Sequence, residues 1–163
     1  MNENDISIHA LALILGEKLK ARRMTISTAE SCTAGAIGSA IASVDGASAY
    51  YLGGVVTYAT RLKEELLSVD SNIIKRYGVV SKETATEMNI GVRKLTGADI
   101  AISITGYAGA NGGDEFAKNG TIWICVGMKG KETLTTCLFV DGERSENLRR
   151  AVIMALETTV DYI

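Results

Sequence analysis

Apolar and polar positions follow two different rhythms along the chain, one typical of helices and one typical of strands. Apolar residues at helical spacing predict helices over 5–22, 36–44, 60–67, 71–77, 82–96 and from 145 to about 161. Short runs rich in apolar and β-branched residues predict strands over 24–28, 51–58, 99–105, 121–127 and 132–140. Capping chemistry predicts helix starts at Asp5, Thr60, Ser81 and Ser145. In the first helix we expect Ile6, Ala10, Leu13 and Ile14 to face inward.

The order of these elements predicts a single α/β domain over residues 1–163. Helices alternate with strands, and the last two strands form a hairpin around Lys129-Gly130. We therefore expect a three-layer α/β/α sandwich with a mixed, mostly parallel sheet and a C-terminal β-hairpin. Glycine-rich turns follow the strands at 24–28 and 99–105. Because ligands of open α/β sheets bind outside the carboxyl ends of strands, these two turns form the expected binding region.

Charge and cysteine content narrow the class of protein. The net charge is −2, so the basic excess of a nucleic-acid-binding protein is missing and no direct nucleic-acid partner is expected. The three cysteines are scattered and suggest no disulfide framework, which fits a reducing cytoplasm. The apolar stretch near the N-terminus follows acidic residues and is too short to span a bilayer. We read it as an amphipathic helix and expect no membrane association.

A hydrolase built on this sequence would need a base other than histidine. The only histidine, His9, lies within the first predicted helix, where a surface position is typical. With a single histidine inside a helix, the scattered cysteines cannot complete a zinc site, so no metal is expected. A lysine can act as base when burial lowers its pKa toward neutrality. Lys63 follows a strand end and is the candidate, although its spacing also fits an ordinary solvated lysine.

Ser31 lies in the turn between a predicted strand and helix, where its hydroxyl would be exposed. Backbone N–H groups of Cys32, Thr33 and Ala34 would be free at the helix start and could hold a phosphate or an oxyanion. Simple helix capping by Ser31 and Thr33 is the alternative. Cys32 is a second candidate nucleophile, but no histidine is available to ionise it and a small buried cysteine is the commoner role.

The segment TGYAGANGGDEFAKNGT provides glycines that let backbone amides approach a ligand closely. It lacks the lysine-serine ending of a Walker loop and the order of a dinucleotide-binding turn. By itself it also fits a flexible surface loop.

Three segments taken together are more specific than any one of them: TAESCTAG (28–35), GVVTYATRLK (54–63) and TGYAGANGG (105–113). In order and spacing they resemble the CinA C-terminal domain family. RYGVVSKETATEM (76–88), GTIW (120–123) and DGER before the last helix match the same pattern, so the resemblance covers about residues 8 to 160. This chain differs from the family pattern at loop positions, namely Ala34, Ala59, Thr60, Tyr107, Ala110 and Asn119.

The resemblance implies a three-layer α/β domain and a nicotinamide-nucleotide amidase, which converts nicotinamide mononucleotide (NMN) and water to nicotinate mononucleotide and ammonia. It implies Ser31 as nucleophile, with Tyr58, Lys63 and Thr105 lining the catalytic site. The expected substrate ligands are Thr33, Gly35, Gly106, Gly109, Gly112, Gly113 and either Arg144 or Arg149. In the mechanism that follows, Ser31 attacks the carboxamide and Lys63 accepts the hydroxyl proton directly or through Tyr58. No cofactor is expected, and a homodimer is the expected assembly, with the strand over 132–140 as one possible pairing edge.

Other function classes stay open at the level of sequence. The chain could be a noncatalytic nucleotide-binding domain, or an amidase for another small carboxamide whose pocket is set by Tyr107 and Ala110. It could also be a partner protein in DNA uptake or repair, as the competence name of the family suggests.

Overall fold

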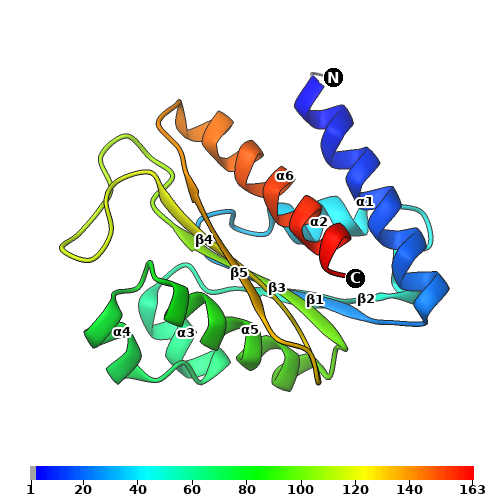
Figure 1. Cartoon of the computed structure of the whole chain (residues 1–163), viewed down its shortest axis with the longest axis horizontal. Coiled ribbons are helices and arrows are strands. Elements are labelled where there is room, and N and C mark those ends of the chain that lie inside the picture. Colours follow the sequence, from blue (N-terminus) through cyan, green and yellow to red (C-terminus); the bar gives the residue numbers. More distant parts are fainter. Residues whose placement is uncertain (1–2) are drawn as a thin grey trace.

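The computed structural model describes residues 3–163, and its side chains from Ser7 onward, as one five-stranded sheet with helices on both faces (Figure 1). The strands are β1 (Ile26–Glu30), β2 (Tyr51–Val56), β3 (Ile100–Gly106), β4 (Thr121–Met128) and β5 (Leu134–Phe139). The helices are α1 (Glu3–Arg22), α2 (Ala36–Ala42), α3 (Thr60–Leu67), α4 (Ser71–Tyr77), α5 (Lys82–Thr96) and α6 (Arg144–Tyr162), with a 3₁₀ turn η1 (Ala47–Ala49).

The sheet has the strand order β2-β1-β3-β4-β5. The pairs β1–β2 and β1–β3 are parallel, whereas β3–β4 and β4–β5 are antiparallel, so β4 alone runs against the other strands. Helices α1, α2 and α6 cover one face of the sheet, and α3, α4 and α5 cover the other (Figure 1). The predicted three-layer sandwich with a mixed sheet and a C-terminal hairpin is therefore confirmed.

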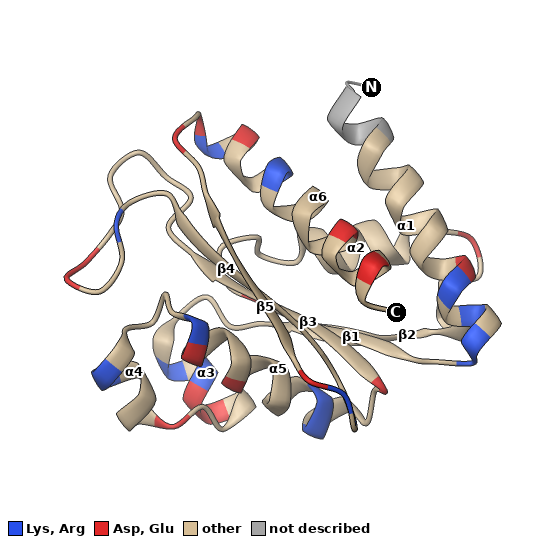
Figure 2. Cartoon of the chain, in the orientation of Figure 1, with Lys and Arg blue, Asp and Glu red and all other residues tan. Residues whose placement is uncertain are grey.

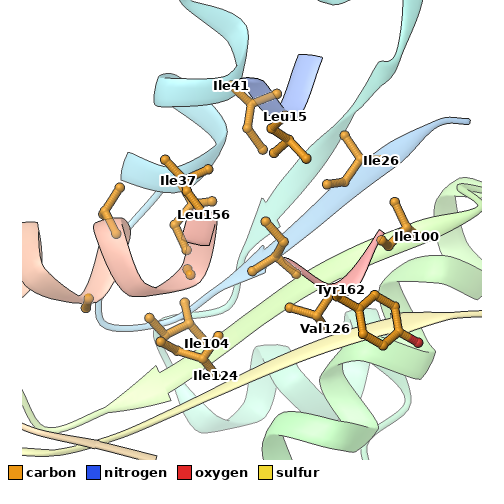
Figure 3. Close-up of a cluster of buried hydrophobic side chains, with 14 of the residues drawn as sticks. Leu15, Ile26, Ile37, Ile41, Ile100, Ile104, Ile124, Val126, Leu156 and Tyr162 are labelled. Atoms are coloured by element: carbon orange, nitrogen blue, oxygen red, sulfur yellow. The ribbon is translucent and has the colours of Figure 1, made fainter. Parts of the chain in front are cut away.

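The larger core lies between the sheet and the layer formed by α1, α2 and α6 (Figure 3). Isoleucines of β3 and β4 meet Leu15 of α1 and Leu156 of α6 there, all with exposed fractions of zero. Each such aliphatic side chain contributes about 1.5–3 kcal/mol by its removal from water. A smaller cluster around Met88 and Val92 lies under α5 on the other face. Strand β3 is consequently buried on both faces, as its continuous apolar run predicts.

The inward face of α1 differs from the prediction. Ala10, Leu13 and Ile14 are exposed, and the buried apolar side chains are those of Ala12, Leu15 and Leu19. The segment ALALIL presents apolar side chains on almost every side, so periodicity alone does not select a face. Packing against the sheet and α6 selects it instead. Asp5 and Ile6 lie outside the residues whose side chains are described.

Helix ends agree with the sequence where a local cap decides them. Ser81 Oγ accepts a hydrogen bond of 3.1 Å from the N–H of Thr84, and Gly97 ends α5 with φ +74°. The other predicted caps are wrong. Helix α1 begins at Glu3, so residue 5 lies inside it. Helix α3 begins after Ala59 and α6 begins after Glu143, one and two residues before the predicted caps and neither with a side-chain cap. Strand β1 begins at Ile26 rather than residue 24 and continues to Glu30, because its pairing with β2 and β3 extends that far.

Charged side chains are spread over both helical layers (Figure 2). The basic residues at the end of α1 are partly used within the molecule. Lys18 Nζ donates to the carbonyls of Val160 and Ile163 at 2.5 and 3.1 Å, which satisfies the end of α6, and Lys20 pairs with Glu17 at 2.6 Å. None of the described helices is long and apolar enough to cross a lipid bilayer.

Candidate active site

A cavity of about 270 Å³ opens where the carboxyl ends of β1, β2 and β3 meet. This is the edge of the sheet at which ligands of α/β proteins are expected. Segments far apart in the sequence supply its walls, namely the turn after β1, the start of α3, the turn before α5 and the glycine-rich loop after β3. Its lining residues are Ser31, Cys32, Tyr58, Thr60, Lys63, Val79, Val80, Thr105, Gly106, Tyr107, Ala108, Gly109, Asn111, Gly112 and Arg144.

Ser31 and Lys63 meet directly in this cavity. Lys63 Nζ lies 3.0 Å from Ser31 Oγ and donates a second hydrogen bond of 2.6 Å to the carbonyl of Thr57. The lysine residue is 1% exposed and Ser31 is 8% exposed. The backbone of Ser31 is held from the other side, because its N–H donates to the carbonyl of Ile104 at 3.0 Å. The fold thus places a hydroxyl and an amine within proton-transfer distance.

Burial changes the acid–base character of this amine. Removal of the ammonium from water lowers the pKa of Lys63 to about 8, and the neighbouring Cys32 opposes part of that shift. Roughly a tenth of the amine is therefore neutral at pH 7. A neutral amine that contacts a hydroxyl can accept its proton, which is the chemistry required of a base beside a nucleophile. The alternative of a solvated surface lysine does not fit an exposed fraction of 1%.

The turn after Ser31 is organised by Glu30 rather than by free helix amides. Helix α2 begins at Ala36, and the Glu30 carboxylate accepts hydrogen bonds from the N–H groups of Gly35, Ile37 and Gly38 at 3.0, 3.1 and 2.8 Å. The hydroxyl of Thr33 donates to the same carboxylate at 2.7 Å. The expected anion site at the helix start is thus already filled by a side chain. The N–H group of Cys32, a residue that lines the cavity, remains as a candidate oxyanion donor in this turn.

Tyr58 and Arg144 form the outer rim of the cavity. Tyr58 is 59% exposed, and its hydroxyl accepts a hydrogen bond of 3.2 Å from Arg144 Nη2. The same guanidinium lies over Gly109, where a Cβ would come within 3.3 Å of Arg144 Nη1. A cation is thereby held at the mouth of the cavity, beside the backbone of the glycine-rich loop. Since Lys63 contacts Ser31 without an intervening group, no relay through Tyr58 is needed.

Thr105 lies at the end of β3 and is 1% exposed. Its hydroxyl donates to the carbonyl of Val79 at 2.9 Å, which ties the turn before α5 to the sheet. Because the hydroxyl proton is used in this bond, Thr105 can offer a substrate only its acceptor lone pairs.

The glycine-rich loop is internally braced. Asn119 accepts from the N–H of Gly112 and donates to the carbonyl of Ala110, both at 3.0 Å. The Tyr107 hydroxyl donates to Asp114 at 2.8 Å, and burial together with this carboxylate raises the pKa of Tyr107 to about 12. Backbone pairing fixes Tyr107 further, since its N–H donates to Thr121 and its carbonyl accepts from Gly120. These hydrogen bonds hold the glycine-rich loop in one conformation as a wall of the cavity.

Several expected ligands lie outside the cavity lining. Thr33 and Gly35 are bound to Glu30, Gly113 forms a bridge with Lys118, and Arg149 lies further along α6 than Arg144. We therefore do not retain these four as substrate ligands.

Conversely, the sequence patterns did not single out Thr60, Val79, Val80 and Asn111 as lining residues, or Glu30 as an organiser of the turn. The match of RYGVVSKETATEM to the family pattern was the available signal for the two valines.

Cys32 lies beside Ser31 but has the character of a buried thiol. It is 5% exposed, and burial raises the pKa of its thiol to about 12. Thiolate formation is thereby suppressed, which disfavours Cys32 as the nucleophile. His9 is exposed on α1 and does not line the cavity.

Comparison with known proteins gives a consistent result. The profile of the CinA C-terminal domain matches residues 8–163. The chain is 37% identical over 153 residues to the protein named nicotinamide-nucleotide amidohydrolase PncC of Enterobacter agglomerans, covering 94% of this chain and 93% of that protein. Its counterpart in Escherichia coli K12 is 36% identical over 154 residues, with the same coverage. The CinA-like protein of Thermotoga maritima is 41% identical over 145 residues, but the chain spans only 35% of its length.

Solved structures agree with this picture. The crystal structure of a competence-damaged protein (CinA) superfamily member from Escherichia coli superposes with a TM-score of 0.94 at 32% identity, covering all of this chain and 94% of that one. A competence or damage-inducible protein from Enterobacter asburiae gives a TM-score of 0.91 at 31% identity, covering 95% of this chain and 97% of that one.

Proposed function

The chain belongs to the CinA C-terminal domain family, and we propose that it is an amidohydrolase that removes ammonia from nicotinamide mononucleotide. The observation that carries the reaction type is the contact of 3.0 Å between the buried Lys63 amine and the Ser31 hydroxyl. Support for the substrate comes from the amidohydrolase name of relatives that the chain matches over nearly their whole length.

The proposed reaction has two halves. Ser31 Oγ attacks the carboxamide carbon while its proton passes to the neutral Lys63 amine. The resulting oxyanion accepts a hydrogen bond from the backbone N–H group of Cys32. When the carbon–nitrogen bond breaks, Lys63 returns the proton to the departing nitrogen, which leaves as ammonia. Water then attacks the ester on Ser31, with Lys63 again as base, and releases nicotinate mononucleotide. The scheme uses no metal or redox cofactor.

Incubation of the purified protein with NMN tests this proposal. We expect ammonia and nicotinate mononucleotide in equal amounts, measured by an ammonia assay and by chromatography. A protein that binds NMN without turnover would be a binding domain instead. Release of ammonia only from other members of a carboxamide panel would assign a different substrate to the same chemistry, with Tyr107 in the cavity wall as a residue that could set the difference.

The reaction should accelerate as pH rises through about 8, because the protonated Lys63 amine cannot accept the serine proton. Below that pH, kcat/KM should fall about tenfold per pH unit, and above it a plateau is expected. The pyridinium ring of bound NMN is cationic and further disfavours the ammonium, so the midpoint of the kcat profile should lie at lower pH than that of kcat/KM. A kcat/KM profile that is flat between pH 6 and 9 would contradict lysine as the base.

Arg144 is the proposed ligand of the substrate phosphate, because its guanidinium stands at the cavity mouth over Gly109. Replacement of Arg144 by alanine should raise KM for NMN by about tenfold or more, the loss expected for a charged hydrogen bond. The KM of Arg144→Lys should lie between those of wild type and Arg144→Ala, since an ammonium lacks the planar fork that binds phosphate.

Two controls isolate the phosphate contact. Arg149→Ala changes an arginine on the same helix that does not line the cavity, and KM should stay within about twofold of wild type. Nicotinamide riboside lacks the phosphate, so Arg144→Ala should alter its turnover little. An equal loss with both substrates would mean that Arg144 does not contact the phosphate.

A further inference from the structure

A buried carboxylate adjoins the nucleophile but takes no part in the chemistry above. Glu30 is the last residue of β1, directly before Ser31, and is 1% exposed. A carboxylate in such a place is costly unless its oxygens are fully bonded. Its partners are one hydroxyl and three backbone N–H groups, all supplied by residues 33–38. The buried carboxylate thus binds the segment that directly follows the nucleophile.

This carboxylate replaces the local cap that α2 lacks. The N-cap residue Gly35 has φ +99° and no side-chain hydrogen bond to the helix, and Ala34 before it also has a positive φ, +51°. Two successive residues in this region turn the chain sharply between Ser31 and α2. Glu30 reaches across that turn from the strand and binds amides on its far side. Beside the backbone hydrogen bonds from Ala34 to Ser31 and from Ala36 to Thr33, Glu30 is therefore the side chain that holds this turn.

The backbone of Glu30 belongs to a closed chain of contacts that includes the dyad. The carbonyl of Glu30 accepts from the N–H of Thr57 at 2.8 Å, and the carbonyl of Thr57 accepts from Lys63 Nζ at 2.6 Å. Lys63 Nζ in turn contacts Ser31 Oγ at 3.0 Å, and Ser31 is covalently joined to Glu30. A shift of the turn changes the position of Ser31 Oγ relative to an amine whose own place is fixed by Thr57.

We propose that Glu30 is a positioning residue for the nucleophile: its carboxylate holds the turn over residues 31–35 so that Ser31 Oγ faces Lys63 and the adjacent N–H group of Cys32 faces the cavity. The inference rests on the proposed function for its consequence in turnover. Its effect on the position of Ser31 can be measured through the reactivity of the Ser31 hydroxyl, without NMN.

Glu30→Gln is the informative variant, because it keeps the shape of the side chain. Both oxygens of Glu30 are acceptors, Oε1 for Gly38 and Oε2 for Thr33, Gly35 and Ile37. A glutamine in either orientation points its NH₂ group at one or more of these donors, so a bond is lost and two donors face each other. The turn should shift locally while the chain stays folded.

The experiment measures covalent labelling of Ser31 by a fluorophosphonate, followed by intact-protein mass spectrometry. In this reaction the Oγ–phosphorus bond forms, fluoride leaves, and the hydroxyl proton passes to Lys63. Wild type should be labelled, and Ser31→Ala should not. Glu30→Gln should be labelled about tenfold or more slowly than wild type, since displacement of a reacting group by a fraction of an ångström has effects of this size. With NMN, kcat should fall by a similar factor, whereas KM should change less than about threefold.

A matched control separates positioning from general loss of stability. Val126→Ala removes core volume in β4 and should lower the melting temperature, but its labelling rate should stay within about twofold of wild type. If Glu30→Gln does not fold, Thr33→Val removes one of the four donors without changing charge and should slow labelling about threefold. A folded Glu30→Gln, or in its absence Thr33→Val, with the labelling rate of wild type would overturn the proposal.

The outcomes distinguish this inference from the proposed function. Wild type that is labelled at Ser31 but does not release ammonia from NMN would refute the substrate and leave the role of Glu30 to be decided by the labelling rates. Wild type that is not labelled at Ser31 would overturn the positioning role together with the activated nucleophile.

Discussion

Replacement of Lys63 by methionine should lower the rate of ammonia release by about 10³–10⁴-fold while leaving the fold intact. The variant removes the amine that accepts the Ser31 proton but keeps an unbranched side chain of similar length in a site that is 1% exposed. Loss of a general base costs about 10²–10⁴-fold in rate. Since the same amine also protonates the leaving group, we expect kcat to fall toward the upper end of that range. The measurement is steady-state ammonia release from NMN at pH 8.5, where the wild-type amine is mostly neutral.

The stability of Lys63→Met should be equal to or greater than that of wild type. Burial lowers the pKa of Lys63 to about 8, below its value in the unfolded chain, so the unfolded state binds more protons over the interval between those two values. Wild-type stability should therefore rise with pH through that interval, and at neutral pH the fold bears the cost of a buried amine. Methionine removes this cost. A melting curve at pH 7 tests the expectation.

Two companion variants complete this test. Ser31→Ala should be as inactive as Lys63→Met, and the double variant no worse than either, because the two residues act as one unit. Lys75→Met removes an exposed lysine on α4 and should leave the rate within about twofold of wild type. Activity of Lys63→Met above about a tenth of wild type would assign the proton transfer to another group.

Replacement of Gly91 by alanine should destabilise the protein more than most single substitutions. A Cβ at Gly91 on α5 would lie 2.1 Å from the carbonyl oxygen of Leu67 and 2.8 Å from its Cβ. The first atom belongs to the backbone of α3 and the second is bonded to it, so neither can move without the helix. Overpacking of this kind costs about 3 kcal/mol. For a chain of this size the melting temperature should fall by roughly 10 °C.

The same substitution should impair catalysis through α3. Leu67 ends the helix that carries Lys63, so displacement of α3 moves the amine away from Ser31. The measurements are thermal unfolding and turnover of NMN at a temperature where the variant remains folded. Ile90→Ala, at a 45% exposed position next to Gly91, is the control and should cost about 0.5 kcal/mol or less. A Gly91→Ala protein with the melting temperature of wild type would show that α3 and α5 separate easily.

The segments that are readable from sequence are those whose decisive interactions are local. Ser81 and Gly97 bound α5 through hydrogen bonds and backbone geometry within a few residues, and the apolar run over 99–105 predicts a strand buried on both sides. Family motifs in the sequence point to Ser31, Lys63, Tyr58, Thr105 and either Arg144 or Arg149. The structure brings the first four and Arg144 to one cavity. The caps and the apolar run need no knowledge of the rest of the chain, whereas the site residues were indicated by the family resemblance.

The tertiary structure alone decided which face of α1 is buried and which residues of the first turn are free to act. The segment ALALIL is apolar on nearly every side, so only packing against the sheet and α6 selects Ala12, Leu15 and Leu19. Likewise, Thr33 and the amides at the start of α2 look available in the sequence, but they are bound to Glu30. Most decisively, the shift of the Lys63 pKa arises from burial beneath segments distant in sequence. Desolvation depends on everything that surrounds a group, and that environment exists only once the chain has folded.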